Sequence, residues 1–330
     1  MTLVEQRLTP LPALSDPAPH ADEPDPADYL QALRHAPLIC FDRHEPFLPL
    51  AVGYTVFRTD GPSRSFSRDV VLPPGAALGI EYAIWWDWDI QHLYELEHIW
   101  VYLDQTGRVI KAEASWHGLY NEMIDEAGQP PLEAGRLVLH SESGKHAFAP
   151  SARWLHERAD MTHRHCTTLA GVMGLHVTPV FESALRRKRN PLVNGLVLSA
   201  LRRHAFQPSF IYDLVFDLRE TMVVPWSSLA EWIPQRVTWW VRRLGWLVLL
   251  PEHSAPLQAP DPARGRVPLR PAGQMGEAPV LFVRPRQRLA ARLLKEAGWT
   301  VAGRAIRLYL DGKRLAWQTR RLVFSQTPPE

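Results

Sequence analysis

Residues 80–104 have the sequence IEYAIWWDWDIQHLYELEHIWVYLD, in which two aromatic and aliphatic runs enclose a polar middle. The two runs belong to Gly79–Trp86 and Glu97–Leu103, whose composition is that of β-strands. Similar runs, each bounded by turn residues, lie at Leu50–Arg58, Ser67–Leu72, Arg108–Trp116 and Gly135–His140. Because the spacing is regular and no long helix intervenes, the pattern predicts antiparallel sheet, most simply a β-sandwich.

Helical patterns become frequent in the second half of the chain. Pro191–His204 has helical periodicity, and Ser227–Leu244 predicts one or two amphipathic helices, with Pro234 breaking or kinking the run. A short helix is expected at Tyr29–His35 and a strand at Phe210–Phe216. The expected fold class is therefore mainly β, and α+β overall: an antiparallel β-sandwich with added helices and a small C-terminal helix-plus-hairpin unit.

Composition divides the chain into four parts. They are a disordered acidic Pro-rich leader, a β-sandwich with helical additions, a Pro/Gly-rich linker and a small basic α/β unit, at residues 1–28, 29–250, 251–279 and 280–330. The last part is expected to hold a helix at Arg286–Ala297 and a hairpin that turns at Asp311-Gly312.

The near-neutral charge of the chain hides two oppositely charged parts. Between Val280 and Leu322, 11 basic residues stand against 2 acidic ones, a net charge of +9, so the rest carries −7 within the total of +2. The two parts are expected to attract each other or a charged partner. The basic unit lacks the interleaved aromatic residues of an RNA-binding sheet, which disfavours nucleic acid as that partner.

The overall composition excludes several classes of protein. The 330 residues are 46% hydrophobic with 13 Trp, enough for a substantial core. Cys40 and Cys166 cannot form a disulfide framework or a four-thiolate zinc site. The N-terminus has no secretory pattern, and the most apolar segment, Val237–Leu250, contains two arginines. A soluble cytoplasmic protein is the expectation.

The polar middle of residues 80–104 is a candidate metal site. Six titratable side chains lie within 12 residues: Asp87, Asp89, His92, Glu95, Glu97 and His98. In a strand, Asp87 and Asp89 share one face, and the same holds for Glu95 and Glu97. A loop through Ile90–Tyr94 would bring His92 towards both pairs. Carboxylates that converge need a cation to offset their repulsion, and three carboxylates with one imidazole favour Mg²⁺, Mn²⁺ or Ca²⁺. The alternative is a solvated loop with outward charges, but the adjacent tryptophans favour a site.

Three segments then follow one another in a distinctive order. They are Tyr82–Asp89 with His92-Leu93-Tyr94-Glu95-Leu96-Glu97, then Glu113–Tyr120, then Lys145-His146-Ala147. They resemble, in this order, an aromatic strand ending in Asp with a Gly-His-Arg-His-Asp-Trp-Glu heptad, a Ser-Ala-Ser-Gly-His-Gly-Gly-Tyr stretch and an Asn-His-Ala turn. These are motifs of the necrosis- and ethylene-inducing peptide-like family of cytolysin-type β-sandwiches, and the resemblance spans roughly residues 38–150.

The resemblance implies a β-sandwich and a divalent cation bound by four side chains. The implied ligands are those that the spacing also indicates, namely Asp89, His92, Glu95 and Glu97. Leu93 and Tyr94 stand where the heptad has Arg and its second His, and Glu95 and Leu96 replace its Asp and Trp. Because no secretory pattern is found, toxicity to plant membranes is not carried over with the fold and the metal.

We therefore expect a divalent-metal-binding β-sandwich protein that recognises a polar small molecule, a glycan or a lipid head group without turnover. The first alternative is a metal-dependent hydrolase with His117 or His146 as general base or acid. The second is a metal-free interaction or membrane-surface protein that uses the Trp- and Arg-rich segment Trp226–Trp246. That segment equally suits packing on the sandwich, which we favour.

A second cluster lies in the segment from Asp160 to His176. Its possible zinc ligands are Asp160, His163, His165, Cys166 and His176. They meet no standard zinc spacing. We expect instead a long loop that covers the sandwich, with Cys166 buried as a small hydrophobic residue.

Overall fold

The computed structural model describes residues 25–249 and the backbone of six short strands between residues 280 and 325. The helices are α1 (Pro26–Arg34), α2 (Ala152–His156), α3 (Ala159–Cys166), α4 (Glu182–Leu185), α5 (Pro191–Arg202) and α6 (Trp226–Leu249). Single 3₁₀ turns are η1 (Pro179–Phe181), η2 (Arg186–Lys188) and η3 (Leu218–Glu220). Two β-sheets carry the site.

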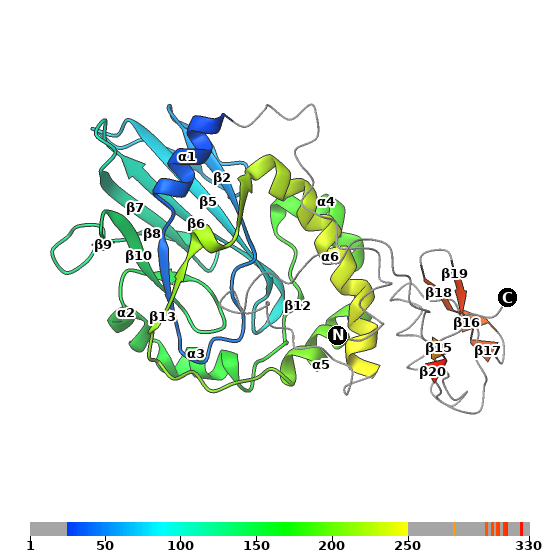
Figure 1. Cartoon of the computed structure of the whole chain (residues 1–330). Coiled ribbons are helices and arrows are strands. Elements are labelled where there is room, and N and C mark those ends of the chain that lie inside the picture. The colour runs from blue at the N-terminus through cyan, green and yellow to red at the C-terminus, as the bar shows by residue number, and fades with distance from the viewer. Residues whose placement is uncertain are drawn as a thin grey trace.

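The larger sheet (Figure 1) has the strand order β14-β2-β5-β6-β7-β8, with β12 added at one end of β6. Its strands are β2 (Ala51–Phe57), β5 (Leu78–Trp88), β6 (His92–Leu103), β7 (Val109–Trp116), β8 (Leu119–Glu122), β12 (Gly174–Leu175) and β14 (Met222–Pro225). The run from β2 to β8 is antiparallel, as the turn spacing predicted. β14 and β12 pair in parallel with β2 and β6.

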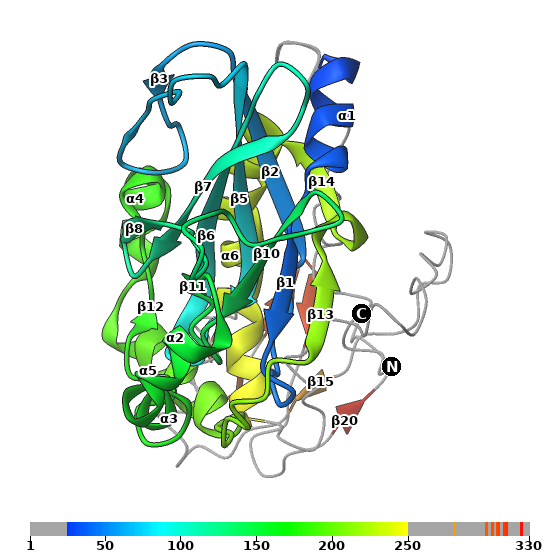
Figure 2. The same ribbon diagram turned by 90° about the vertical axis from the view of Figure 1, so that its left-hand side faces the viewer.

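The smaller sheet has the order β11-β10-β1-β13, with β9 paired to β10. Its strands are β1 (Leu38–Phe41), β9 (Leu132–Glu133), β10 (Arg136–Ser141), β11 (Phe148–Ala149) and β13 (Leu214–Asp217). A further pair, β3 (Gly61–Pro62) with β4 (Asp69–Val70), lies outside both sheets. The two large sheets lie face to face (Figure 2), so the predicted sandwich within an α+β fold is confirmed. The parallel pairing of β1 with β10 is an addition to the antiparallel pattern.

The central strands β5 and β6 are buried on both faces. From Gly79 to Trp88, and along all of β6, every residue is buried. The ring of Trp86 packs 6.3 Å from that of Phe148 in the smaller sheet, whereas its neighbour Trp85, on the opposite face of the strand, packs 6.1 Å from Trp232 of α6. Because both faces are covered, this hairpin has aromatic residues at successive positions and lacks the in–out alternation of a half-exposed strand.

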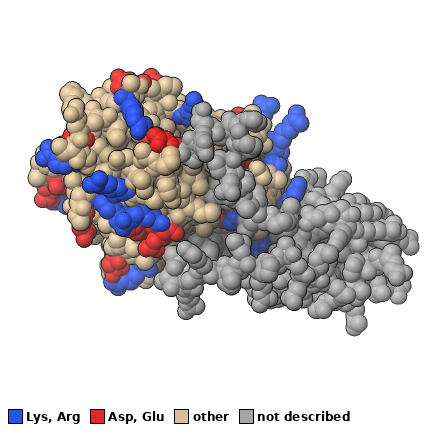
Figure 3. Space-filling view, turned by 45° about the horizontal axis from the view of Figure 1, so that its top comes forward, with Lys and Arg blue, Asp and Glu red and all other residues tan. Residues whose placement is uncertain are grey.

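Helix α6 is a single helix that contains Pro234. Its Trp226, Trp232 and Trp240 are buried in the core, which supports packing on the sandwich. Within residues 25–249, no helix is long and apolar enough to cross a membrane. On the face drawn in Figure 3, basic and acidic side chains are interspersed.

Helices α1 and α5 follow their sequence signals, whereas α3 forms in the Asp160–His176 segment, where the expectation of a long loop was wrong. Helix α5 begins after Asn190, whose side chain accepts hydrogen bonds from the backbone N–H groups of Leu192 and Val193 at 3.1 and 3.0 Å. With Pro191 in its first turn, this is the start that the sequence predicted. Helix α1 begins at Pro26, inside the segment assigned to the leader.

Short antiparallel pairs occur in the C-terminal part. They are β15 (Val280–Leu281) with β20 (Phe324–Ser325), β16 (Val301–Ala302) with β17 (Ala305–Ile306), and β18 (Leu308–Leu310) with β19 (Lys313–Leu315). The last pair flanks Asp311-Gly312, where a hairpin turn was predicted. The expected helix at Arg286–Ala297 and the linker at 251–279 lie outside the described residues. The four-part division of the chain stays a prediction.

Candidate metal centre

The candidate site lies at the turn between β5 and β6. Strand β5 ends at Trp88, and the Asp89 and His92 backbones exchange hydrogen bonds of 3.0 and 3.3 Å across the turn. The Asp89 side chain accepts a bond of 2.7 Å from the Gln91 N–H, which closes the turn locally. The Ile90 N–H donates to the carbonyl of Gly144 at 2.8 Å, so the turn is also fixed to the loop between β10 and β11.

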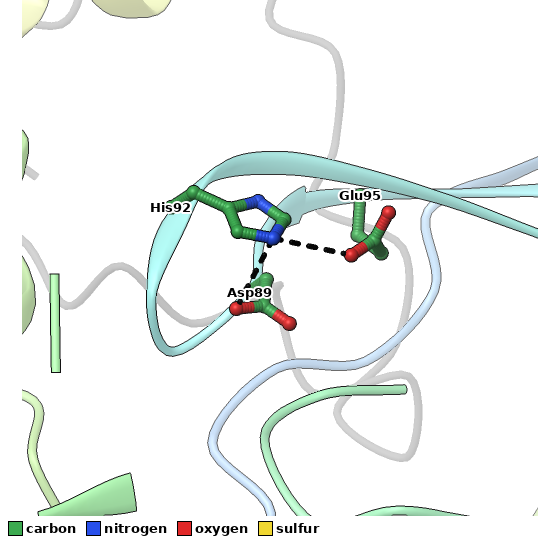
Figure 4. Close-up of side chains that lie close together, drawn as sticks. All are labelled: Asp89, His92 and Glu95. Atoms are coloured by element: carbon green, nitrogen blue, oxygen red, sulfur yellow. Dashed lines mark ion pairs between the residues drawn. The ribbon is translucent and has the colours of Figure 1, made fainter. Parts of the chain in front are cut away.

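Three side chains converge at this turn, as Figure 4 shows. His92 Nε2 lies 3.5 Å from Asp89 Oδ1 and 3.4 Å from Glu95 Oε2. One ligand atom from each of the three residues lies within 4.8 Å of the other two, and all three residues are buried. Two ligands at right angles around an ion, each about 2.1–2.4 Å from it, are about 3.0–3.4 Å apart. The spacing therefore fits adjacent ligands of one cation.

A backbone irregularity at Tyr94 makes this convergence possible. His92 and Glu95 are three positions apart and would point to opposite faces of a regular strand. Tyr94 has φ 57°, in the left-handed region, while the register of β5 with β6 is the same on either side of it, Trp86↔Glu95 and Trp88↔Leu93. This turn of the backbone at Tyr94 lets His92 and Glu95 face the same point.

The protonation of His92 follows from its other nitrogen. Nδ1 lies 2.8 Å from the backbone carbonyl of Tyr94, which only accepts hydrogen bonds, so Nδ1 carries the proton. Burial lowers the pKa of His92 to about 3, although the Asp89 carboxylate opposes the shift, so the ring is neutral at pH 7. The Nε2 lone pair therefore faces two carboxylate oxygens. A histidine oriented in this manner by a carbonyl is typical of metal ligands.

Lys145 is the cation nearest to the triad in the described structure. Its Nζ donates to both oxygens of Asp89, at 2.7 and 2.8 Å. Burial opposes ionisation of both groups, but their mutual attraction outweighs it: the pKa of Asp89 lies below its usual range and that of Lys145 above. Glu95 has no such bond, and burial with the charges of Glu97 and Asp89 raises its pKa well above the usual value.

Glu97, the fourth expected ligand, points to the same side of β6 but has another partner. Its Oε2 accepts a hydrogen bond from the Ser115 hydroxyl on β7. Burial raises the pKa of Glu97 to about 7. The structure thus brings Asp89, His92 and Glu95 together, whereas Glu97 lies two residues further along β6 and is bonded to Ser115.

Asp87 does not share a face with Asp89. It accepts two hydrogen bonds from Arg236 of α6, whereas Asp89 is bonded to Lys145. The strand ends at Trp88, so the strand period does not extend to Asp89. No local sequence pattern indicates that Arg236 pairs with Asp87 or that Lys145 pairs with Asp89, because each contact joins segments far apart in the chain.

The two histidines expected for a hydrolase differ in environment. His117 Nε2 lies 2.8 Å from Glu142 Oε2, and its side chain is 38% exposed. Burial lowers the pKa of His117. The hydrogen bond to Glu142 and the negative charge of that carboxylate raise the pKa by more than burial lowers it, so the net shift is upward. His146 is fully buried, stacked on Trp86 at 4.7 Å, with Nε2 at 3.3 Å from Glu45.

The Asp160–His176 segment does not form a metal cluster among the described residues. Asp160 and His163 are exposed, whereas Cys166 is buried and donates to the carbonyl of Ser143 at 3.1 Å. Burial raises the pKa of the Cys166 thiol. This agrees with the expected role of Cys166 as a small buried residue. His176 instead lies against His92, with 4.8 Å between the rings.

No family model and no curated protein matches the chain. Among solved structures, it matches NLPPya in complex with glucosamine at 18% identity and TM-score 0.27, over 39% of this chain and 70% of that chain. It also matches NLPPya in complex with mannosamine at 19% identity and a TM-score of 0.27, over 41% of this chain and 74% of that chain. A third structure, described as a toxin fold as basis for microbial attack and plant defense, matches at 17% identity and a TM-score of 0.26. This match covers 36% of this chain and 66% of that chain. These are structures of the necrosis- and ethylene-inducing peptide-like family, which the motifs resemble.

Proposed function

We propose that this chain binds one divalent cation through Asp89, His92 and Glu95, and that the bound ion recognises a polar ligand without turnover. The orientation of His92 carries the proposal. A neutral imidazole whose Nε2 lone pair faces oxygens of Asp89 and Glu95 at 3.5 and 3.4 Å is repelled by the Asp89 carboxylate, and by Glu95 as well whenever that group is ionised. A cation between the three atoms converts this repulsion into three coordinate bonds.

The donor set selects the class of ion. Two carboxylates suit Mg²⁺, Ca²⁺ and Mn²⁺, and these ions take six or more ligands. Three protein ligands would leave positions for water or for oxygens of a ligand such as a glycan or a lipid head group. The Glu95 side chain is the most exposed of the three at 12%, so a ligand would approach from its side. Glu97 becomes a fourth ligand if its bond to Ser115 is exchanged for the ion.

A metal-dependent hydrolase is the second candidate, and one observation favours it. The His117–Glu142 pair has the form of a general base held by a carboxylate, and the His117 side chain is partly exposed. His146 is a weaker candidate for this role because it is enclosed between Trp86 and Glu45. Turnover that is lost in His117→Gln while ligand binding persists would favour the hydrolase.

Three other expectations belong to this proposal. A cytoplasmic location remains a prediction from the sequence alone. The burial of Trp226, Trp232 and Trp240 favours an α6 that packs in the core over one that lies on a membrane. Attraction between the basic C-terminal part and the acidic remainder is a third prediction, tested by salt titration.

The test is a calorimetric titration of the 330-residue chain with Mn²⁺, Ca²⁺ and Mg²⁺, after treatment with a chelator. We expect one site per chain. Asp89→Asn and Glu95→Gln should each weaken binding at least tenfold, because each removes one charged ligand without changing side-chain size. The matched control is Glu126→Gln, whose side chain is 88% exposed. Equal binding by all four proteins would refute the site, and a loss in Glu97→Gln would add the fourth ligand.

A further inference from the structure

The loop between β10 and β11 places an ammonium group at the candidate site. Lys145 Nζ bonds both Asp89 oxygens, and the side chains of the two residues are 5% and 0% exposed. Of these oxygens, Oδ1 is the one that lies 3.5 Å from His92 Nε2. The ammonium therefore already binds the carboxylate that a divalent cation would use.

This position of Lys145 is fixed by the backbone around it. The Gly144 N–H donates to Glu45 Oε2 at 2.7 Å, and the Gly144 carbonyl accepts from Ile90 in the β5–β6 turn. Gly144 has φ 68°, and a Cβ there would lie 2.9 Å from the side chain of Ile90. The loop thus approaches the turn as closely as sterics permit, and Lys145 can leave Asp89 only by moving its side chain.

We propose that Lys145 is an internal counter-ion: it holds Asp89 in place when no metal is bound, and it competes with a divalent cation for that carboxylate. This inference rests on the metal binding proposed above. An ion held between Asp89 Oδ1 and His92 would take one of the two oxygens from Lys145 and would repel the remaining ammonium. The site would then be assembled without metal and would bind metal weakly.

The test compares Mn²⁺ affinities of wild type, Lys145→Met and Lys145→Gln by calorimetry at one pH. We expect both variants to bind at least tenfold more tightly than wild type, because the competing charge is gone. The matched control is Lys111→Met, which removes a half-buried lysine that donates to Glu113 at 2.8 Å on β7. In this control, the affinity should not change. Lys145→Gln retains an amide donor for Asp89 and serves if Lys145→Met does not fold.

A second measurement reports the counter-ion role itself. In a chelator, both Lys145 variants should melt at a lower temperature than wild type, since Asp89 is left buried without its cation. Saturating Mn²⁺ should raise their melting temperature by more than it raises that of wild type.

The outcomes separate this inference from the proposed function. Equal affinity in wild type and the Lys145 variants overturns the competition and leaves metal binding intact. Weaker binding by the variants also overturns it, because Lys145 would then help to build the site. Absence of binding in all the proteins overturns the metal site and the inference with it.

Discussion

Removing Arg236 from helix α6 should destabilise the protein far more than removing an exposed arginine. Arg236 donates to Asp87 through Nε at 2.8 Å and through Nη2 at 2.5 Å. The two side chains are 10% and 8% exposed. Among residues 25–249, Trp85 Nε1 is the other donor to Asp87, at 3.2 Å. In Arg236→Met, the apolar stem is retained, but Asp87 stays buried with this single neutral donor.

The magnitude follows from that burial. Breaking a buried ion pair by removal of one partner costs about 3–5 kcal/mol, because the remaining charge is uncompensated. We expect the lower end of this range, about 3 kcal/mol, since methionine still packs against Trp239, which lies 4.7 Å from the guanidinium carbon. The control is Arg43→Met, which breaks a pair with Asp213 whose side chains are 54% and 50% exposed. Such an exposed pair contributes little to stability, because solvent screens its charges.

The assay is urea unfolding followed by tryptophan fluorescence, with the free energy of unfolding extrapolated to water. The double variant Asp87→Asn, Arg236→Met should lose about 2 kcal/mol less unfolding free energy than the two single variants lose together, because neither charge is then buried alone. A loss in Arg236→Met no larger than in Arg43→Met would refute the reasoning. Strict additivity in the double variant would also refute it.

Two further predictions concern His98 and Gly171. Burial lowers the pKa of His98 to about 3, below its unfolded value of 6.5, so its contribution to stability is present above pH 6.5 and is lost as pH falls towards 3. In His98→Phe, the acid-induced loss of unfolding free energy over this range should shrink by on the order of 3 kcal/mol, measured by urea unfolding at successive pH values. Gly171→Ala should lower the free energy of unfolding by at least about 2 kcal/mol more than Gly107→Ala in the same assay. Both glycines have positive φ, so the backbone strain is shared. A Cβ at Gly171 would lie 2.6 Å from Leu198 Cα, whereas a Cβ at Gly107 would meet nothing within 4 Å. Equal losses in the two alanine variants, or an unchanged acid response in His98→Phe, would contradict these expectations.

Much of the sheet structure could be predicted from the sequence because its signals are local. Residues such as Pro73-Pro74-Gly75 and Gln105-Thr106-Gly107 end apolar runs, and strands β2, β5, β7 and β10 were predicted within two residues of their observed bounds. Strand β6 begins at His92, five residues before the predicted Glu97, so the expected loop through Ile90–Tyr94 is wrong for its last three residues. Strand β1, Leu38–Phe41, was missed because it is four residues long. Its parallel pairing with β10 depends on a contact across about 100 residues, which no local pattern reports.

The candidate site was predictable in composition and less so in geometry. The spacing brought Asp89, His92 and Glu95 into one hypothesis, and the structure places them together. The reason they face one another is the left-handed Tyr94, and tyrosine is not a residue whose presence signals positive φ. Lys145 stood in a segment already noted, but its bond to Asp89 depends on how the β10–β11 loop meets the β5–β6 turn.

The acidic side chains at the β5–β6 turn differ in whether a basic side chain balances their charge, and this difference favours a cation site at the turn. Asp87 and Asp89 each have a basic side chain of their own, Arg236 and Lys145, and neither needs a further cation. Among the described residues, Glu95 forms no ion pair with a lysine or an arginine: its Oε1 accepts a hydrogen bond from the Leu96 N–H at 2.8 Å, and its Oε2 lies 3.4 Å from the neutral His92. The raised pKa of Glu95 means that a proton is taken up there when nothing else supplies positive charge. A divalent cation and that proton are therefore alternatives at one position, so metal binding should release a proton and strengthen as pH rises.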